Sequence, residues 1–151
     1  MGIMQIPRRV DYGLRAAIYL STQDPDRSCS LAEIAKRQGI PRKFLEKIIQ
    51  NLIRSGLVKS KRGPDGGYTL TKSPDEISFQ DIIESLEGPI AVNVCMDQHL
   101  SCDHLPRCTM MGVWSEIQRE VVDIFARTSL ADLQRTPCQA LMTSSSLSSA
   151  A

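Results

Sequence analysis

The sequence contains neither a long apolar run nor the residue constellations of the common catalytic sites. A membrane-spanning helix needs about 18 uninterrupted apolar residues, and polar residues interrupt every run of this chain before that length. Its start lacks the charged and then apolar pattern of a signal peptide. There is no recognisable Ser/His/Asp set, and the glycine-rich residues 63–67 lack the Lys-Ser/Thr of a phosphate-binding loop. We therefore expect a cytoplasmic protein without a membrane anchor and without enzymatic activity.

Cysteines are few, and their number is odd. The chain has five, which in a reducing cytoplasm favours metal ligands or free thiols over a disulfide framework. Cys95, Cys102 and Cys108 lie together in a polar stretch, whereas Cys29 and Cys138 stand alone. Thiolates are soft ligands that select zinc and iron–sulfur centres. We therefore expect the three grouped cysteines to hold a metal or a cluster and the other two to be free thiols.

The small net charge of +1 conceals an asymmetry between the two halves of the chain. Residues 1–72 carry 14 Lys and Arg against 6 Asp and Glu, a net charge of +8, while residues 73–151 carry 4 against 11, a net charge of −7. A basic segment of this kind is typical of a domain that binds a polyanion. The first half of the chain is therefore the expected nucleic-acid-binding half.

Capping signals and hydrophobic periodicity predict a helix-turn-helix near the start of the chain. A helical repeat of apolar residues covers residues 7–21. Ser30 and Glu33 then form a capping box for a helix over residues 31–38. After a glycine turn, a second amphipathic helix packs one face, with Phe44 among its apolar residues, and exposes a mixed basic and polar face.

A β-hairpin and a further helix complete the predicted domain. Residues 57–62 and 68–71 have the composition of strands on either side of a glycine and proline turn. Ser78 starts another capped helix, which stops at Gly88. We therefore predict a mostly α fold with a small β-hairpin, in which residues 1–88 form a winged helix-turn-helix domain.

The exposed face of the second helix carries side chains suited to a DNA major groove. Lysine and arginine bind guanine or phosphate, glutamine pairs with adenine, and glutamate accepts from cytosine, while the wing can reach an adjacent minor groove. We predict DNA contacts from Arg42, Lys43, Glu46, Lys47 and Gln50 in the helix and from Lys61 and Arg62 in the wing. The alternative is an ordinary solvated helix face in a protein-binding domain.

The rest of the chain divides into a loop, a pairing helix and a tail. Residues 89–108 hold the three grouped cysteines without a sustained hydrophobic period, which predicts a loop. Residues 109–135 are predicted to form a dimerisation helix followed by a C-terminal segment. The apolar stripe of this helix, between Met110 and Phe125, is too wide for so small a domain to bury, which favours a two-fold homodimer. The predicted interface consists of Met110, Trp114, Ile117, Val121 and Ile124. Residues 136–151 are the predicted tail, whose end at residues 144–151 lacks the apolar content to pack, and we expect this tail to be disordered.

Four segments together resemble the Rrf-two (Rrf2) superfamily of winged-helix regulators. They are residues 30–35, 44–46, 56–58 and, above all, the wing sequence Arg-Gly-Pro-Asp-Gly-Gly-Tyr at residues 62–68, with the three cysteines following. The resemblance extends over residues 4–135. It implies a homodimeric regulator of a palindromic DNA operator, usually a repressor, in which an iron–sulfur cluster controls DNA binding in response to nitric oxide, redox state or iron supply.

The resemblance also implies the ligands of that cluster. Cys95, Cys102 and Cys108 match the three cysteines of the family. IscR-like members have a histidine three residues after the last cysteine, where this chain has Met111, and NsrR-like members use an aspartate in the first helix of the partner subunit, which matches Asp11. We expect Asp11, supplied across the dimer, as the fourth ligand, and a 4Fe-4S cluster ahead of a 2Fe-2S cluster.

Other assignments stay open beside this one. His104 or His99 can take the place of Asp11, which can instead form an ion pair with Arg15 one helical turn away. A zinc ion held by the three cysteines and one histidine, or thiol oxidation without metal, would make a redox sensor on the same fold. A cofactor-free adaptor that binds another protein through the loop is the remaining alternative.

Overall fold

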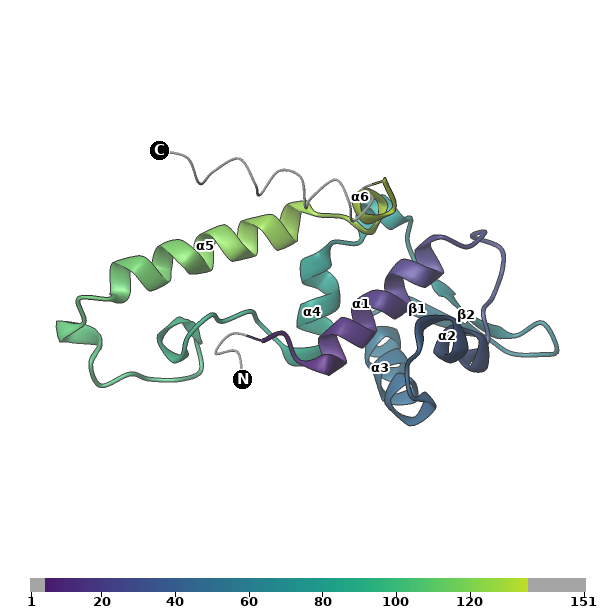
Figure 1. Ribbon diagram of the computed structural model, residues 1–151, viewed down its shortest axis with the longest axis horizontal. Helices are drawn as coiled ribbons and strands as arrows, with labels where there is room; N and C mark the ends of the chain where they lie inside the picture. Colours follow the sequence, from purple (N-terminus) through teal and green to yellow (C-terminus); the bar gives the residue numbers. More distant parts are fainter. Residues whose placement is uncertain (1–4, 136–151) are drawn as a thin grey trace, which may run out of the picture.

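In the computed structural model, which describes residues 5–135, a long helix and the cysteine loop form an arm that extends from a winged helix-turn-helix head (Figure 1). The predicted tail, residues 136–151, lies outside the described residues. No helix within residues 5–135 is long and apolar enough to cross a membrane. The elements are α1 (Arg8–Ser21), α2 (Leu31–Gln38), α3 (Arg42–Arg54), β1 (Val58–Lys61), β2 (Gly67–Leu70), η1 (Pro74–Glu76), α4 (Phe79–Glu87), η2 (Val94–Met96), η3 (Leu105–Arg107), α5 (Met111–Arg127) and α6 (Leu130–Arg135), where η denotes a 3-10 helix. The predicted mostly α fold with one hairpin is confirmed.

The helix-turn-helix follows from local signals in the sequence. The Ser30 hydroxyl accepts from the backbone N–H of Glu33 over 3.1 Å and so caps the start of α2. Gly39 ends the helix in the left-handed conformation, at φ 62°, which residues with a β-carbon rarely adopt. The turn that follows leads directly into α3, as predicted.

The wing is anchored to the segment that precedes α2. β1 and β2 pair antiparallel, with Val58 opposite Leu70 and Lys61 opposite Gly67. Tyr68 of β2 also exchanges two backbone hydrogen bonds with Cys29, at 3.0 and 2.8 Å. These bonds fix β2 to the head and leave the turn projecting.

The core lies where α1, α3 and α4 meet. One face of α3 is completely buried. Small residues on α1 allow α1 to approach α3 and α4 closely. Each large apolar side chain removed from water stabilises the fold by about 1.5–3 kcal/mol. The central side chains are Val10, Ala16, Ala17, Ile34, Leu45, Ile48, Ile49, Leu52, Ile82 and Leu86.

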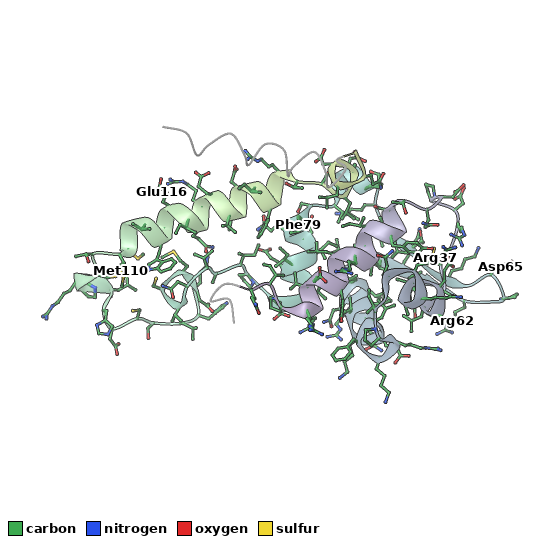
Figure 2. All side chains as sticks on the ribbon, in the orientation of Figure 1. Arg37, Arg62, Asp65, Phe79, Met110 and Glu116 are labelled. Carbon is green, nitrogen blue, oxygen red and sulfur yellow. The ribbon has the colours of Figure 1, made fainter. Side chains whose placement is uncertain are left out.

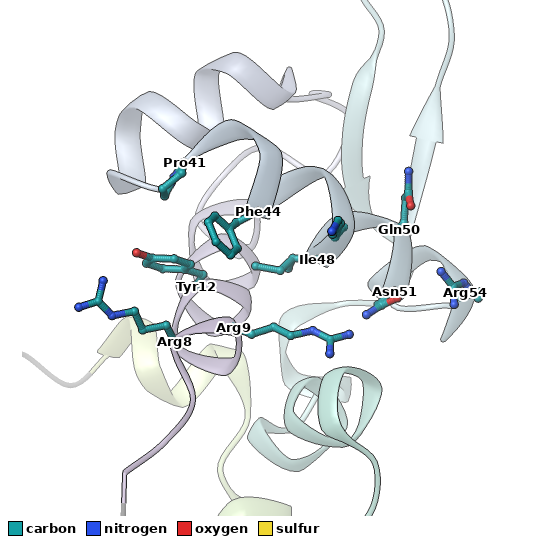
Figure 3. A pocket seen from close by; sticks show the side chains of 10 residues that line it. Arg8, Arg9, Tyr12, Pro41, Phe44, Ile48, Gln50, Asn51 and Arg54 are labelled. Atoms are coloured by element: carbon teal, nitrogen blue, oxygen red, sulfur yellow. The ribbon is translucent and has the colours of Figure 1, made fainter. Parts of the chain in front are cut away.

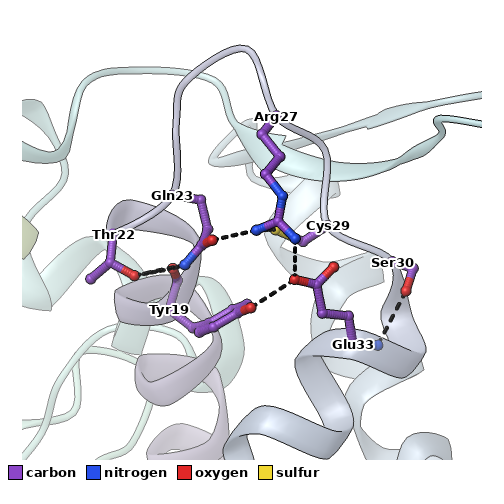
Figure 4. A network of polar contacts seen from close by, with 7 residues as sticks. All are labelled: Tyr19, Thr22, Gln23, Arg27, Cys29, Ser30 and Glu33. Carbon is purple, nitrogen blue, oxygen red and sulfur yellow. Dashed lines mark hydrogen bonds and ion pairs between the residues drawn. The ribbon is translucent and has the colours of Figure 1, made fainter.

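A polar network joins α1, the following loop and α2 (Figure 4). The Tyr19 hydroxyl donates to Glu33 over 2.8 Å, and Arg27 donates to the same carboxylate oxygen over 2.6 Å. Arg27 also donates to Gln23. The hydrogen bond from Tyr19, together with Arg27, lowers the pKa of Glu33 below its ordinary value. Cys29 is fully buried beside this network as a free thiol, and burial raises its pKa.

Two details differ from the sequence prediction. Phe44, predicted on the packing face of α3, is 59% exposed, because it stands at the edge of the apolar stripe, where the Tyr12 ring lies beside it. The chain after α5 also turns back onto the head as α6, where Leu130 is fully buried. Ser129 and Asp132 form the capping interaction that starts this helix.

Candidate functional site

The side chains predicted for a major groove lie together on the outer face of α3. Arg42, Lys43, Glu46, Lys47 and Gln50 are all exposed, and we term this set the recognition face. The Nε of Arg42 lies 3.5 Å from a carboxylate oxygen of Glu46. Because the opposite face of α3 is anchored in the core, these side chains project from a rigid support.

The wing presents its cations at the end of the first strand. Lys61 and Arg62 are exposed where β1 enters the turn, and Figure 2 shows Arg62 and Asp65 on the projecting hairpin. The turn needs glycine, because a β-carbon on Gly66 would lie 2.5 Å from the carbonyl oxygen of Lys61. β1 contacts α3, so the wing and the recognition face belong to the same end of the molecule.

The three grouped cysteines surround one cavity of about 160 Å³ on the arm. Cys95 lies in η2, while Cys102 and Cys108 lie before and after η3. All three are partly buried free thiols. The rest of the wall consists of Asn93, Val94, His104, Leu105, Met110, Met111 and Trp114.

Gln118 of α5 holds the start of the cysteine loop. Its amide donates to the carbonyl of Ile90 over 2.6 Å and accepts from the N–H of Val92 over 2.9 Å. Asn93 then caps η2 by accepting from the N–H of Val94 over 2.8 Å. Gln118 is not predictable from the sequence, because no periodicity distinguishes it from a solvated polar residue on a helix.

The donor set suits a cluster better than a single ion. In the described part of the chain, no three His, Cys, Asp or Glu side chains are close enough together to hold one metal ion. An iron–sulfur cluster spans several ångström and distributes its ligands over two or more iron atoms, so the ligands as a set stand further apart than those of one ion. Three thiols spread around a common cavity fit that requirement.

The candidates for a fourth ligand lie in different places. His104 lines the cavity, and Met111 lines it at the position of the IscR-like histidine, whereas His99 is exposed outside it. Asp11 does not line the cavity of its own chain; its carboxylate lies 3.0 Å from the Nε of Arg15 on a half-exposed face of α1. A contribution from Asp11 therefore requires a second subunit.

The predicted dimer interface has an outward and an inward part. Met110 and Ile124 are 61% and 45% exposed, and Val113 beside them is 60% exposed. Trp114, Ile117 and Val121 are half-buried within their own chain, and Trp114 forms part of the cysteine cavity. The outward residues leave an apolar strip on α5 that favours a partner surface.

Known proteins share both the sequence and the arrangement of these elements. A family model named Rrf2 and described as an iron-dependent transcriptional regulator matches residues 6–136. A protein of Aquifex aeolicus named as an HTH-type transcriptional regulator is 36% identical over 126 residues, covering 82% of this chain and 87% of that protein. Protein rrf2 of Nitratidesulfovibrio vulgaris is 30% identical over 132 residues, covering 87% and 88%.

Two solved structures of regulators have the same fold. CymR of B. subtilis, described as a global cysteine regulator, matches with a TM-score of 0.73 at 32% identity, covering 89% of this chain and 100% of that chain. IscR of T. potens matches with a TM-score of 0.73 at 31% identity, covering 88% of each. These relatives are transcriptional regulators and not enzymes. Because the family model spans nearly all the described residues, the chain belongs to the Rrf2 family of winged-helix transcriptional regulators.

Proposed function

We propose that this protein is a homodimeric repressor that binds a palindromic operator and that an iron–sulfur cluster held by Cys95, Cys102 and Cys108 controls this binding. The observation that carries the proposal is the cavity of about 160 Å³ whose wall includes all three thiols. The cavity lies on the arm, while the recognition face and the wing lie on the head (Figure 2). The chain thus separates a sensing region from a DNA-binding region.

Charge and exposure support the DNA-binding part of the proposal. The recognition face is exposed on a helix whose other face is buried, and the wing adds Lys61 and Arg62. A dimer joined along α5 would present two such helices to half-sites about 34 Å apart, one turn of DNA. A two-fold dimer therefore favours a palindromic operator.

Donors from two subunits would link the sensing region to the head. The three cysteines belong to the arm of one subunit, and Asp11 belongs to α1 in the head of the other. When bound, the cluster would supply a centre that nitric oxide, oxidation or iron shortage alters. Loss of the Asp11 contact would change the spacing of the two heads and lower operator affinity without altering a DNA contact. The resemblance of Asp11 to the aspartate of NsrR-like members favours a 4Fe-4S cluster ahead of a 2Fe-2S cluster.

A zinc-dependent sensor is the second candidate, because His104 lines the same cavity as the three thiols. Three cysteines and one histidine form a common tetrahedral zinc site. The donors would have to approach one ion to about 2.0–2.3 Å, so the loop would have to contract around it. This protein would be colourless and would contain zinc instead of iron and sulfide.

Operator binding measured by fluorescence anisotropy tests the DNA-binding part. Lys47→Gln should weaken operator binding and reduce the slope of log K against log salt by about 1, if the ammonium contacts a phosphate. Arg127→Gln is the matched control, because Arg127 lies on α5 in an exposed ion pair with Asp123. Unchanged affinity of the Lys47 variant at several salt concentrations would remove Lys47 from the DNA contacts.

Metal content tests the cluster part. Cys102→Ala should abolish the native cluster, because it removes one thiolate from the cavity wall. Cys138→Ala is the control, since Cys138 is not among the proposed ligands. Full iron and sulfide in the Cys102 variant would contradict the ligand assignment.

A further inference from the structure

A second groove lies beside the recognition face, between the start of α1 and α3 (Figure 3). Its volume is about 510 Å³. The floor is apolar: the rings of Tyr12 and Phe44 meet edge to face with centroids 6.5 Å apart, and Ile48 lies beside them. Four cationic side chains line the groove, and none of its ten lining residues is acidic. The cations are Arg8, Arg9, Lys47 and Arg54.

Core side chains do not fill this groove, and it is separate from the cysteine cavity on the arm. Phe44 is 59% exposed and lines the groove together with Tyr12. Arg8 and Arg54 are exposed as well, although they stand on different helices. Cations that line one hollow raise the local positive potential and attract an anion.

We propose that this groove binds the sugar–phosphate backbone of DNA, beside the recognition face. The inference rests on the proposed DNA-binding function and adds a third region of contact to it. α3 contacts both β1 and α1, so the recognition face, the wing and the groove are all joined to one helix. Lys47 lines the groove and belongs to the recognition face, which makes the two surfaces continuous.

The chemistry of the groove matches a nucleic-acid backbone. A strand alternates apolar deoxyribose with anionic phosphate, and the groove combines an aromatic floor with arginine side chains. Guanidinium groups bind phosphate oxygens through paired, charge-assisted hydrogen bonds. Such contacts position a protein on DNA without selecting its sequence.

Glu87 competes with DNA for one of these arginines. Its carboxylate lies 3.7 Å from a guanidinium nitrogen of Arg9, and both side chains are partly exposed. An exposed ion pair of this kind contributes little stability, so a phosphate can replace the carboxylate. Glu87 is the last residue of α4, where the chain leaves the head for the cysteine loop.

The test compares Arg8→Gln/Arg54→Gln with the Arg127→Gln control and with wild type. Binding of operator and of an unrelated duplex is measured by fluorescence anisotropy between 0.05 and 0.3 M salt, with thermal melts to verify folding. Because each phosphate contact adds about 0.9 to the salt slope, the double variant should lose about 1.8 in slope and at least about tenfold in affinity for both duplexes. Glu87→Gln should instead strengthen binding to both by about twofold.

Three outcomes of this experiment would contradict the inference. If the double variant keeps the affinity and slope of the control, the groove does not bind the backbone. A loss confined to the operator with an unchanged slope would also overturn the inference, because it would indicate base contacts. If wild-type protein binds neither duplex under any condition, the proposed DNA-binding function fails and the inference fails with it.

Discussion

The side-chain carbonyl of Gln118 accepts a hydrogen bond from the backbone N–H of Val92 over 2.9 Å, and this contact joins the start of the cysteine loop to α5. The amide group of the same side chain donates to Ile90. Gln118 does not line the cavity, yet it fixes the backbone just before η2, which carries Cys95. It is therefore a positioning residue for the proposed cluster site.

Replacing Gln118 should make the cluster less stable without removing a ligand. Gln118→Ala leaves the main-chain groups of residues 90 and 92 without their partner, and we expect roughly tenfold faster bleaching by an iron chelator, as is typical of changes around a metal site. The absorbance decay of anaerobic protein measures this rate. Gln80→Ala is the control, since the Gln80 side chain donates to Glu84 one turn along α4 and lies outside the cysteine loop. Equal decay in the two variants would show that Gln118 does not position the site.

Gly67 is required by the close approach of the wing to Cys29. A β-carbon at residue 67 would lie 2.5 Å from the carbonyl oxygen of Cys29, which is backbone and cannot move aside easily. We expect Gly67→Ala to lower the free energy of unfolding by at least about 2 kcal/mol in urea titrations. Gly112→Ala, where the added carbon meets nothing within 4 Å, should leave stability unchanged or slightly raised. A Gly67 variant as stable as wild type would contradict the observed anchoring of the wing.

The hydrogen bond between Tyr19 and Glu33 should make stability depend on pH. It lowers the pKa of Glu33 below the ordinary value of 4.5, so its contribution is fully present above pH 4.5 and is lost as the pH falls through the folded-state pKa. Tyr19→Phe should lower the free energy of unfolding by about 1 kcal/mol at pH 7. The difference in this free energy between the variant and wild type should be smaller at pH 3.5.

Urea unfolding at the two pH values measures this difference. Tyr12→Phe removes a hydroxyl from the same helix away from the network. Its difference from wild type in free energy of unfolding should be the same at both pH values. A difference between wild type and Tyr19→Phe that is equal at both pH values would argue against the coupling to Glu33.

The outward strip of α5 should control the oligomeric state. Ile124 is 45% exposed in the single chain, so Ile124→Glu changes no core contact but places a charge in the proposed interface. We expect a dimer for wild type and a folded monomer for the variant in light scattering coupled to size-exclusion chromatography. Glu116→Gln is the surface control. A monomeric wild-type protein, or a dimeric Ile124 variant, would refute this interface.

Local signals in the sequence predict much of the head. Ser30 and Gly39 mark both ends of α2, because a cap and a left-handed glycine act within one turn of the chain. Hydrophobic periodicity predicts the apolar face of α3, but it does not predict which residue at the edge of that face stays exposed. Phe44 is such a residue. The Ser129 and Asp132 box is also visible in the sequence, but only the tertiary arrangement shows that Leu130 is buried on the head.

The sequence also predicts part of the candidate site. The spacing of the three cysteines and the wing motif together indicate a shared site, and the structure places the thiols around one cavity. The hydrogen bonds from Gln118 to residues 90 and 92 join positions that are more than 20 residues apart in the sequence. No local sequence pattern predicts such a contact. The role of Asp11 depends on a second subunit, so neither periodicity nor the fold of one chain determines it.

Anaerobic purification, followed by a visible spectrum and by quantification of iron, acid-labile sulfide and zinc per subunit, tests the central claim most directly. We predict brown protein in which iron and sulfide are present in matching amounts, close to four of each for a 4Fe-4S cluster. Colourless protein with about one zinc per subunit, or with no metal at all, would contradict the assignment of Cys95, Cys102 and Cys108 as cluster ligands.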